Sequence, residues 1–216
     1  IISYIVSLTR EERMSEGIRD KVKETFENSI AVKEKILEDK SYEVLIEAGN
    51  LIAESISNGG KLLLCGNGGS AADAQHLAAE FLIRLTSDVN RGSLPAFSLA
   101  QDTSTLTACI NDYGPDDIFK RVFSAMAKDG DILLVITTSG NSKNIIETLK
   151  LARERGIFSL GFLGNGGGKA LKFCDAAFVV PDKITARIQE SHITAGHALL
   201  QYIEDLLLER NWIRKD

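Results

Sequence analysis

The sequence predicts a three-layer α/β/α domain with a central parallel sheet and a helical arm at the N-terminus. From residue 61 to residue 210, short apolar runs alternate with longer amphipathic segments of helical periodicity. The short runs are apolar at consecutive positions, which is typical of parallel strands covered on both faces. The 216 residues suffice for one such domain with an ample core, and we find no linker, repeat or low-complexity segment.

Residues 14–58 are expected to form two helices that precede this core. Apolar residues recur at helical spacing among Lys and Glu, Asp39–Ser41 interrupts the pattern, and Asn58–Gly60 suits a helix end. The arm has one apolar stripe to bury. It can cover its own domain or pack against another subunit, and the sequence leaves both open. Residues 1–13 precede Met14 and receive little functional weight.

Five strands are expected in the core, with helices between them. The expected strands are Leu62–Cys65, Pro95–Leu99, Asp131–Ile136, Ile157–Leu163 and Ala176–Val180. The expected helices are the segment that holds His76 and Glu80, then Thr103–Ile110, Asp116–Ala127, Asn141–Arg155, Ala170–Phe173 and Thr185–Arg210.

Net charge, apolar run length and cysteine spacing argue against several classes of protein. The net charge of −5 argues against a nucleic-acid binder that works by bulk electrostatics. No apolar run approaches the ~20 residues of a membrane span. The cysteines, Cys65, Cys109 and Cys174, show neither a CxxC motif nor zinc-site spacing. We therefore expect a cytoplasmic protein with buried, reduced thiols and with no nucleic-acid or membrane partner.

A glycine-rich turn, Gly66–Ser70, joins the first strand directly to a helix. Glycines allow the backbone to approach a ligand, and a helix N-terminus favours an anion such as phosphate. His76 and Glu80 follow one helical turn apart and can move protons or bind a metal. A surface ion pair is the alternative, but the helix is rich in Ala and Leu, which indicates burial. The turn lacks the full dinucleotide fingerprint and its ribose-binding acid, which disfavours a nucleotide-binding protein.

A second polar turn, Thr137–Ser142, follows the third expected strand and precedes a helix. Its four hydroxyl groups exceed what an N-cap requires, so they can also surround a phosphate. Both turns follow parallel strands, and the carboxyl ends of such strands meet at one edge of the sheet. The sequence therefore predicts one phosphate pocket built from both turns.

The last helix carries the two remaining histidines, His192 and His197. Gln189, Glu190 and His197 span about two turns of that helix. Helix geometry by itself pairs Glu190 with His197, because the two are seven residues apart on one face. For His192 a position on the helix surface is plausible.

These features combine with others along the chain. The combination comprises Cys65–Ser70, His76, Glu80, Asn111–Asp112, Thr138–Ser142, Arg187–Glu190 and His197. From Lys21 to Leu208 the chain resembles the sugar isomerase (SIS) family, and within it the phosphoheptose isomerases. The resemblance implies a homotetramer with active sites at subunit contacts. It also implies conversion of D-sedoheptulose 7-phosphate to D-glycero-D-manno-heptose 7-phosphate, the first step toward the heptose of bacterial lipopolysaccharide.

The resemblance also implies roles for individual residues. Glu80 matches the catalytic base and His197 the partner acid/base. The positions that match substrate contacts are Asn67, Gly68, Gly69, Ser70, Arg84, Asn111, Asp112, Thr137, Thr138, Ser139, Ser142 and Gln189. The positions that match zinc ligands in some members are His76, Glu80, Gln189 and His197.

The chain departs from the family pattern in three places. Thr137 replaces a common Ser, Ala186 replaces an Asp before Arg187, and Thr86–Leu94 is slightly longer than usual. These differences bear on substrate preference more than on reaction type. The alternative is a non-catalytic SIS sensor or a replication-initiation-associated adaptor. Such relatives typically lack the acid and the histidine that match Glu80 and His197, so an isomerase is favoured.

Overall fold

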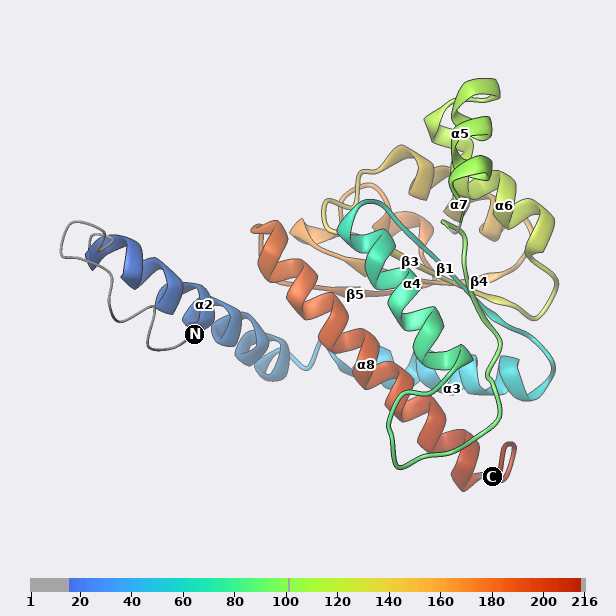
Figure 1. Ribbon diagram of the computed structural model, residues 1–216, viewed down its shortest axis with the longest axis horizontal. Helices are drawn as coiled ribbons and strands as arrows, with labels where there is room; N and C mark the ends of the chain where they lie inside the picture. Colours follow the sequence, from blue (N-terminus) through green and yellow to red (C-terminus); the bar gives the residue numbers. More distant parts are fainter. Residues whose placement is uncertain (1–15, 101, 215–216) are drawn as a thin grey trace, which may run out of the picture.

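The computed structural model describes residues 16–100 and 102–214 (Figure 1). Residues 1–13, which received little functional weight, lie outside this part. The strands form one parallel sheet in the order β2-β1-β3-β4-β5, which confirms the expected fold class. Their bounds are β1 Leu62–Gly66, β2 Ala96–Ser98, β3 Ile132–Thr137, β4 Phe158–Leu163 and β5 Ala176–Val179.

Helices cover both faces of the sheet. The α-helices are α2 Glu16–Glu38, α3 Glu43–Ser57, α4 Gly69–Leu82, α5 Thr103–Asp112, α6 Ile118–Met126, α7 Lys143–Glu154 and α8 Thr185–Glu209. The short 3₁₀ turns are η2 Pro115–Asp117, η3 Asn165–Gly167 and η4 Leu171–Phe173. The expected helix at Ala170–Phe173 is therefore only the turn η4, because the backbone is already extended at Cys174.

Alternating strand residues supply two separate cores. Leu62 and Leu64 of β1 pack on the side of α3, α4 and α8, whereas Leu63 and Cys65 pack on the side of α6 and α7. Both kinds of position are therefore buried, which explains why the strands are apolar at consecutive residues.

The strand order places a topological switch point between β1 and β3. From β1 the chain moves outward to β2, and it then returns to the other side of β1 to form β3. The helices that follow these two strands, α4 and α7, pack on opposite faces of the sheet. Open α/β sheets of this order bind ligands in the crevice at that point.

The N-terminal arm divides into two parts. α3 buries its apolar face against α8, where Gly49 lies against the ring of Tyr202. In the described part of α2 only Val32 and Ile36 are buried, and the first half of this helix projects from the body (Figure 1). The structure thus shows that α3 covers its own domain, while much of the apolar stripe of α2 stays exposed.

The thiols are unpaired. Cys65 and Cys109 are buried, as expected, and Cys174 is half-buried. Burial raises the pKa of the Cys174 thiol to about 12, so this thiol is protonated at neutral pH. Among the described helices, none combines the length and hydropathy that a membrane-spanning helix needs.

Candidate active site

The glycine turn lets α4 start where β1 ends. Gly68, at the N-cap position, has φ +55 and ψ −122, a conformation that favours glycine. A Cβ on Gly66 would collide with the backbone of Ser70. The first amides of α4 therefore lie at the carboxyl end of the sheet, where their partial positive charge favours an anion.

The hydroxyl turn does not serve as a side-chain cap. Ser142 occupies the N-cap position of α7 but makes no capping hydrogen bond with its side chain. Its Oγ lies 3.4 Å from Oγ1 of the buried Thr137. Thr138 is half-buried and Ser139 is exposed. N-capping therefore does not explain why a hydroxyl residue stands at position 142, since the Ser142 hydroxyl makes no capping bond.

The two turns are joined across the switch point. Asn67 and Asn144 exchange two side-chain hydrogen bonds, each 2.9 Å long. The structure thus brings the turns after β1 and β3 together, as the sequence predicted. It adds Asn144, which the sequence analysis did not single out. The one sequence signal for Asn144 was its position, two residues after the hydroxyl turn, since its contact with Asn67 is a tertiary one.

A third loop supports the hydroxyl turn from behind. A Cβ on Gly140 would collide with the carbonyl group of Gly167. Ala170 N donates to Gly140 O at 2.8 Å, and Lys169 N donates to Asn141 Oδ1 at 3.2 Å. The glycine-rich loop after β4, to which the sequence analysis gave no role, therefore holds the hydroxyl turn in place.

The acid/base candidates meet between α4 and α8. Nε2 of His76 lies 2.9 Å from Nε2 of His197 and 3.6 Å from Oε1 of Glu80. The two helices approach closely because Gly196 leaves room for the side chain of Leu77. The side chains of His76 and Glu80 are 46% and 21% exposed, so a ligand can reach them.

Asp73 is a further carboxylate beside the two histidines. Burial raises the pKa of this group, while the charges of His76 and His197 act in the opposite direction. Its Oδ2 is buried and makes no hydrogen bond within the described residues. The sequence analysis missed Asp73, although it precedes His76 by three residues on the same helix face.

Gln189 and Glu190 lie in different surroundings. The side-chain amide of Gln189 lies against Gly69 at the start of α4. Glu190 instead forms an ion pair with Arg187, whose Nη1 also donates to Thr25 O of α2 at 2.9 Å. The geometric pairing of Glu190 with His197 is therefore wrong. α8 lies between α2 and α4 and contacts them with different side chains. Arg187 bonds to α2, whereas His197 contacts α4.

His192 is a core residue, so the expected position on the helix surface is also wrong. Its ring is fully buried beside Phe162, with ring centroids 5.9 Å apart. Nε2 lies 3.1 Å from Leu163 O, and Nδ1 is buried without a hydrogen-bond partner among the described residues. Burial lowers the pKa of His192 from 6.5 to about 4.

We expect this histidine to make stability pH-dependent. The unfolded chain binds a proton at His192 near pH 6.5, but the folded chain does so only near pH 4. The contribution of the neutral His192 ring to the free energy of unfolding is therefore fully present above pH 6.5 and is lost as the pH falls toward 4. Between pH 8 and pH 5 the loss is about 2 kcal/mol. Urea unfolding at both pH values should show a smaller difference for His192→Gln than for the parent, and equal differences would contradict the assignment.

The other candidate substrate contacts lie apart from this centre. Asn111 and Asp112 end α5, are exposed, and pair with each other at 2.7 Å. Within residues 16–100 and 102–214 no hydrogen bond joins them to either turn. Arg84 is exposed just beyond the end of α4, and Ala186 is exposed near the start of α8. Their roles stay predictions.

The zinc assignment also stays a prediction. His76, Glu80 and His197 supply nitrogen and oxygen donors of the types that zinc binds. In the described part of the chain, however, no three His, Cys, Asp or Glu side chains are arranged to hold a metal ion. Gln189 contacts Gly69, two helical turns before His76. The residues thus match zinc in donor type but not in their present arrangement.

Comparison with known proteins agrees with this fold. The SIS domain model matches residues 25–164. The phosphoheptose isomerase of Chlorobaculum parvum is 45% identical over 207 residues, covering 93% of this chain and 99% of that relative. The one from Thermodesulfovibrio yellowstonii is 43% identical over 192 residues, covering 89% and 94%.

A solved structure supports the same assignment. The phosphoheptose isomerase from Neisseria gonorrhoeae superposes with a TM-score of 0.81 at 41% identity. The match covers 87% of this chain and 99% of that one. These comparisons confirm the resemblance drawn from the motifs. The chain belongs to the phosphoheptose isomerase family of SIS-domain enzymes.

Proposed function

We propose that the protein converts D-sedoheptulose 7-phosphate to D-glycero-D-manno-heptose 7-phosphate. The main support is that His197 of α8 meets His76, which neighbours Glu80 on α4, the helix that starts at the glycine turn. An anion site and an acid/base group are thereby held on one element. The non-catalytic alternative, a sugar-phosphate sensor or adaptor, has no need of such a cluster.

The reaction moves one proton between neighbouring carbons and needs no net oxidant. Glu80 removes the proton from C1 of the open ketose, and the electron pair forms the C1–C2 double bond of an enediol. His197 exchanges protons with the two oxygens, so that the O1 hydroxyl becomes the aldehyde and O2 becomes a hydroxyl. Glu80, whose proton exchanges with solvent, then delivers a proton to C2. Each group contributes roughly 10²–10⁴-fold to the rate.

The phosphate is the remote anchor of the substrate. We expect the amides at the starts of α4 and α7 and the hydroxyls of Ser70, Thr138, Ser139 and Ser142 to bind the phosphate at the switch point between β1 and β3. Binding energy from the phosphate then fixes the reacting carbons beside Glu80. Asn67 and Gln189 lie near the same end of α4, and we expect them to contact sugar hydroxyls.

The test is direct turnover. Purified protein is incubated with sedoheptulose 7-phosphate in D₂O, and the product is followed by NMR. We expect the aldose to appear with deuterium at C2, because the proton on Glu80 exchanges with solvent. Binding without turnover would instead support the sensor or adaptor. The same assay with and without EDTA tests a requirement for zinc, and metal analysis of the purified protein measures its zinc content.

We also propose a homotetramer, and the exposed face of α2 supports it. Ile18, Val22, Phe26 and Ile30 recur every four residues and are all exposed, Phe26 by 68%. Such a stripe on a projecting helix is typical of an interface between subunits. A second copy of the chain offers a surface of the same kind, so the contact can be symmetric.

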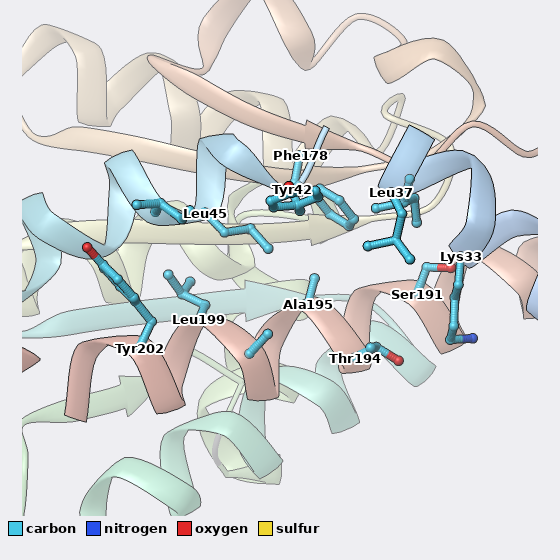
Figure 2. A pocket seen from close by; sticks show the side chains of 13 residues that line it. Lys33, Leu37, Tyr42, Leu45, Phe178, Ser191, Thr194, Ala195, Leu199 and Tyr202 are labelled. Carbon is cyan, nitrogen blue, oxygen red and sulfur yellow. The ribbon is translucent and has the colours of Figure 1, made fainter. Parts of the chain in front are cut away.

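An apolar groove continues this stripe toward the body. It has a volume of about 490 Å³ and lies between α2, α3, α8 and β5. Figure 2 shows Leu45, Tyr42 and Leu37 along the upper edge of the groove, with Leu199 and Ala195 along its lower edge. Since Leu37 belongs both to the groove and to the exposed apolar face of α2, a partner helix can follow the two without interruption.

Phe26→Glu should disrupt this assembly, because it places a charge in an apolar contact. Light scattering coupled to gel filtration should give the parent four times the mass of one chain and the variant a smaller assembly. Lys35→Glu is the matched control, since Lys35 lies on the opposite face of α2 and is exposed. A parent that elutes as a monomer would contradict the tetramer.

Two wider assignments follow from the proposed reaction. The product would enter the synthesis of ADP-heptose and the lipopolysaccharide core, and the enzyme would work in the cytoplasm. The absence of the product sugar from a deletion strain, with recovery on complementation, would support the first assignment.

A further inference from the structure

A buried ion pair joins the loop after α4 to α8. Nε of Arg91 donates to Oε2 of Glu204, and both side chains are 0% exposed. Glu204 Oε1 is buried and has no hydrogen-bond partner among the described residues. Because desolvation offsets much of the attraction, a buried pair commonly stabilises no more than apolar residues of the same volume. Global stability therefore does not explain why this pair is present.

The remaining bonds of the guanidinium indicate another role. Nη1 of Arg91 donates to Phe81 O at 2.9 Å and to Gly92 O at 3.0 Å. Nη2 donates to Glu80 O at 3.1 Å. Arg91 thus binds two successive carbonyl groups in the last turn of α4, and Glu204 holds the guanidinium in the orientation that this requires.

Among the described residues, the last turn of α4 has few other hydrogen-bond donors or positive charges near its carbonyl groups. The last four carbonyl groups of a helix lack partners within the helix, and the partial negative charge there favours a cation. α4 has no basic residue in its last turn. Leu94 N donates to Phe81 O at 3.0 Å. Arg91, which follows the helix in the chain and returns to it, supplies the side-chain donors to Phe81 O and Glu80 O and the positive charge.

This helix end carries the proposed base, since one of the two bound carbonyls belongs to Glu80 itself. The partner helix α8 carries His197 seven residues before Glu204, so both side chains lie on the face toward α4. The ion pair therefore links the backbone of Glu80 to the helix that presents His197.

We propose that Arg91 and Glu204 are positioning residues that fix Glu80 relative to His197. The inference rests on the proposed function, in which Glu80 is the base. Neither side chain contacts the substrate. Their effect is to keep the last turn of α4 closed and in register with α8, so that the carboxylate meets the reacting carbons in the correct geometry.

The test replaces both charges together, because removal of one would leave the other buried and unpaired. Arg91→Met with Glu204→Leu keeps the volume apolar and leaves no unpaired buried charge, so the variant should fold, with a melting temperature lowered only by the loss of the donors to the carbonyl groups. Its kcat should fall about 10- to 100-fold, as expected for a displaced reacting group, while KM changes little. Hydrogen exchange of the peptide that covers the last turn of α4 should become faster than in the parent.

Asp131→Asn is the matched control. Asp131 forms another poorly exposed ion pair, with Lys61, beside the starts of β1 and β3 at the opposite edge of the sheet. We expect a lower melting temperature but parental kcat, which separates structural loss from positioning. A folded double variant with parental kcat, or with unchanged exchange in α4, would overturn the proposal. If the parent itself does not isomerise the sugar, the proposed function fails, and the exchange data then decide on the role of Arg91 and Glu204 in α4.

Discussion

Glu80→Gln is expected to lower kcat by roughly 10²–10⁴-fold, because the amide cannot take a proton from carbon. Gln has nearly the same volume, and within residues 16–100 and 102–214 the carboxylate of Glu80 makes one close contact with a basic group, Nε2 of His76 at 3.6 Å. The fold should therefore persist, with a melting temperature near that of the parent. The measurement is the steady-state rate of heptose phosphate isomerisation by NMR, together with a thermal melt of the same preparation.

Glu154→Gln provides the matched control for this change. Glu154 is an exposed carboxylate at the end of α7, opposite the end that begins at the hydroxyl turn. The substitution removes the same charge and should leave kcat at the parental value. If Glu80→Gln retains a rate close to that of the parent while folded, Glu80 is not the base.

His197→Asn should give the second large effect, a loss of roughly 10²–10⁴-fold in kcat, because proton exchange at the sugar oxygens loses its carrier. His76 contacts both His197 and Glu80 through its Nε2 atom. The three side chains are therefore expected to act as a unit. His76→Asn should also lower kcat, and the double variant should lose less than the product of the two single effects.

A double-mutant cycle measures this coupling. Rates are determined for the parent, for both single variants and for the double variant, with KM followed in parallel. Losses that multiply would show that His76 and His197 act independently, despite the 2.9 Å between their ring nitrogens. A rate for His197→Asn near that of the parent would exclude His197 as the proton carrier.

Most elements of the fold could be predicted, because their signals are local. Consecutive apolar residues identify β1, β3 and β4, and the observed ends differ from the expected ones by at most one residue. Glycine residues indicate the turn after β1, and hydroxyl residues indicate the turn after β3. These signals are local too. Each signal depends on backbone conformation or on burial within a few residues.

Partners that are distant in the sequence could not be predicted in this way. The spacing along α8 suggested Glu190 as the partner of His197, but the structure pairs His197 with His76 of α4. Arg91 and Glu204 are separated by 113 positions, and no periodicity connects them. His192 follows the helical pattern of its neighbours, and only the packing of α8 against β4 shows that it is buried.

The sequence by itself determined the alternation of strands and helices and the two turns, because these depend on local backbone preferences. It also determined the types of acid/base group, because these are the residues themselves. Tertiary structure decided which groups act together. It set α4 and α7 on opposite faces at the switch point, brought His197 to His76, and closed the end of α4 with Arg91. The physical reason is that helix packing selects contacts between distant residues, and these contacts depend on the whole core rather than on spacing along the chain.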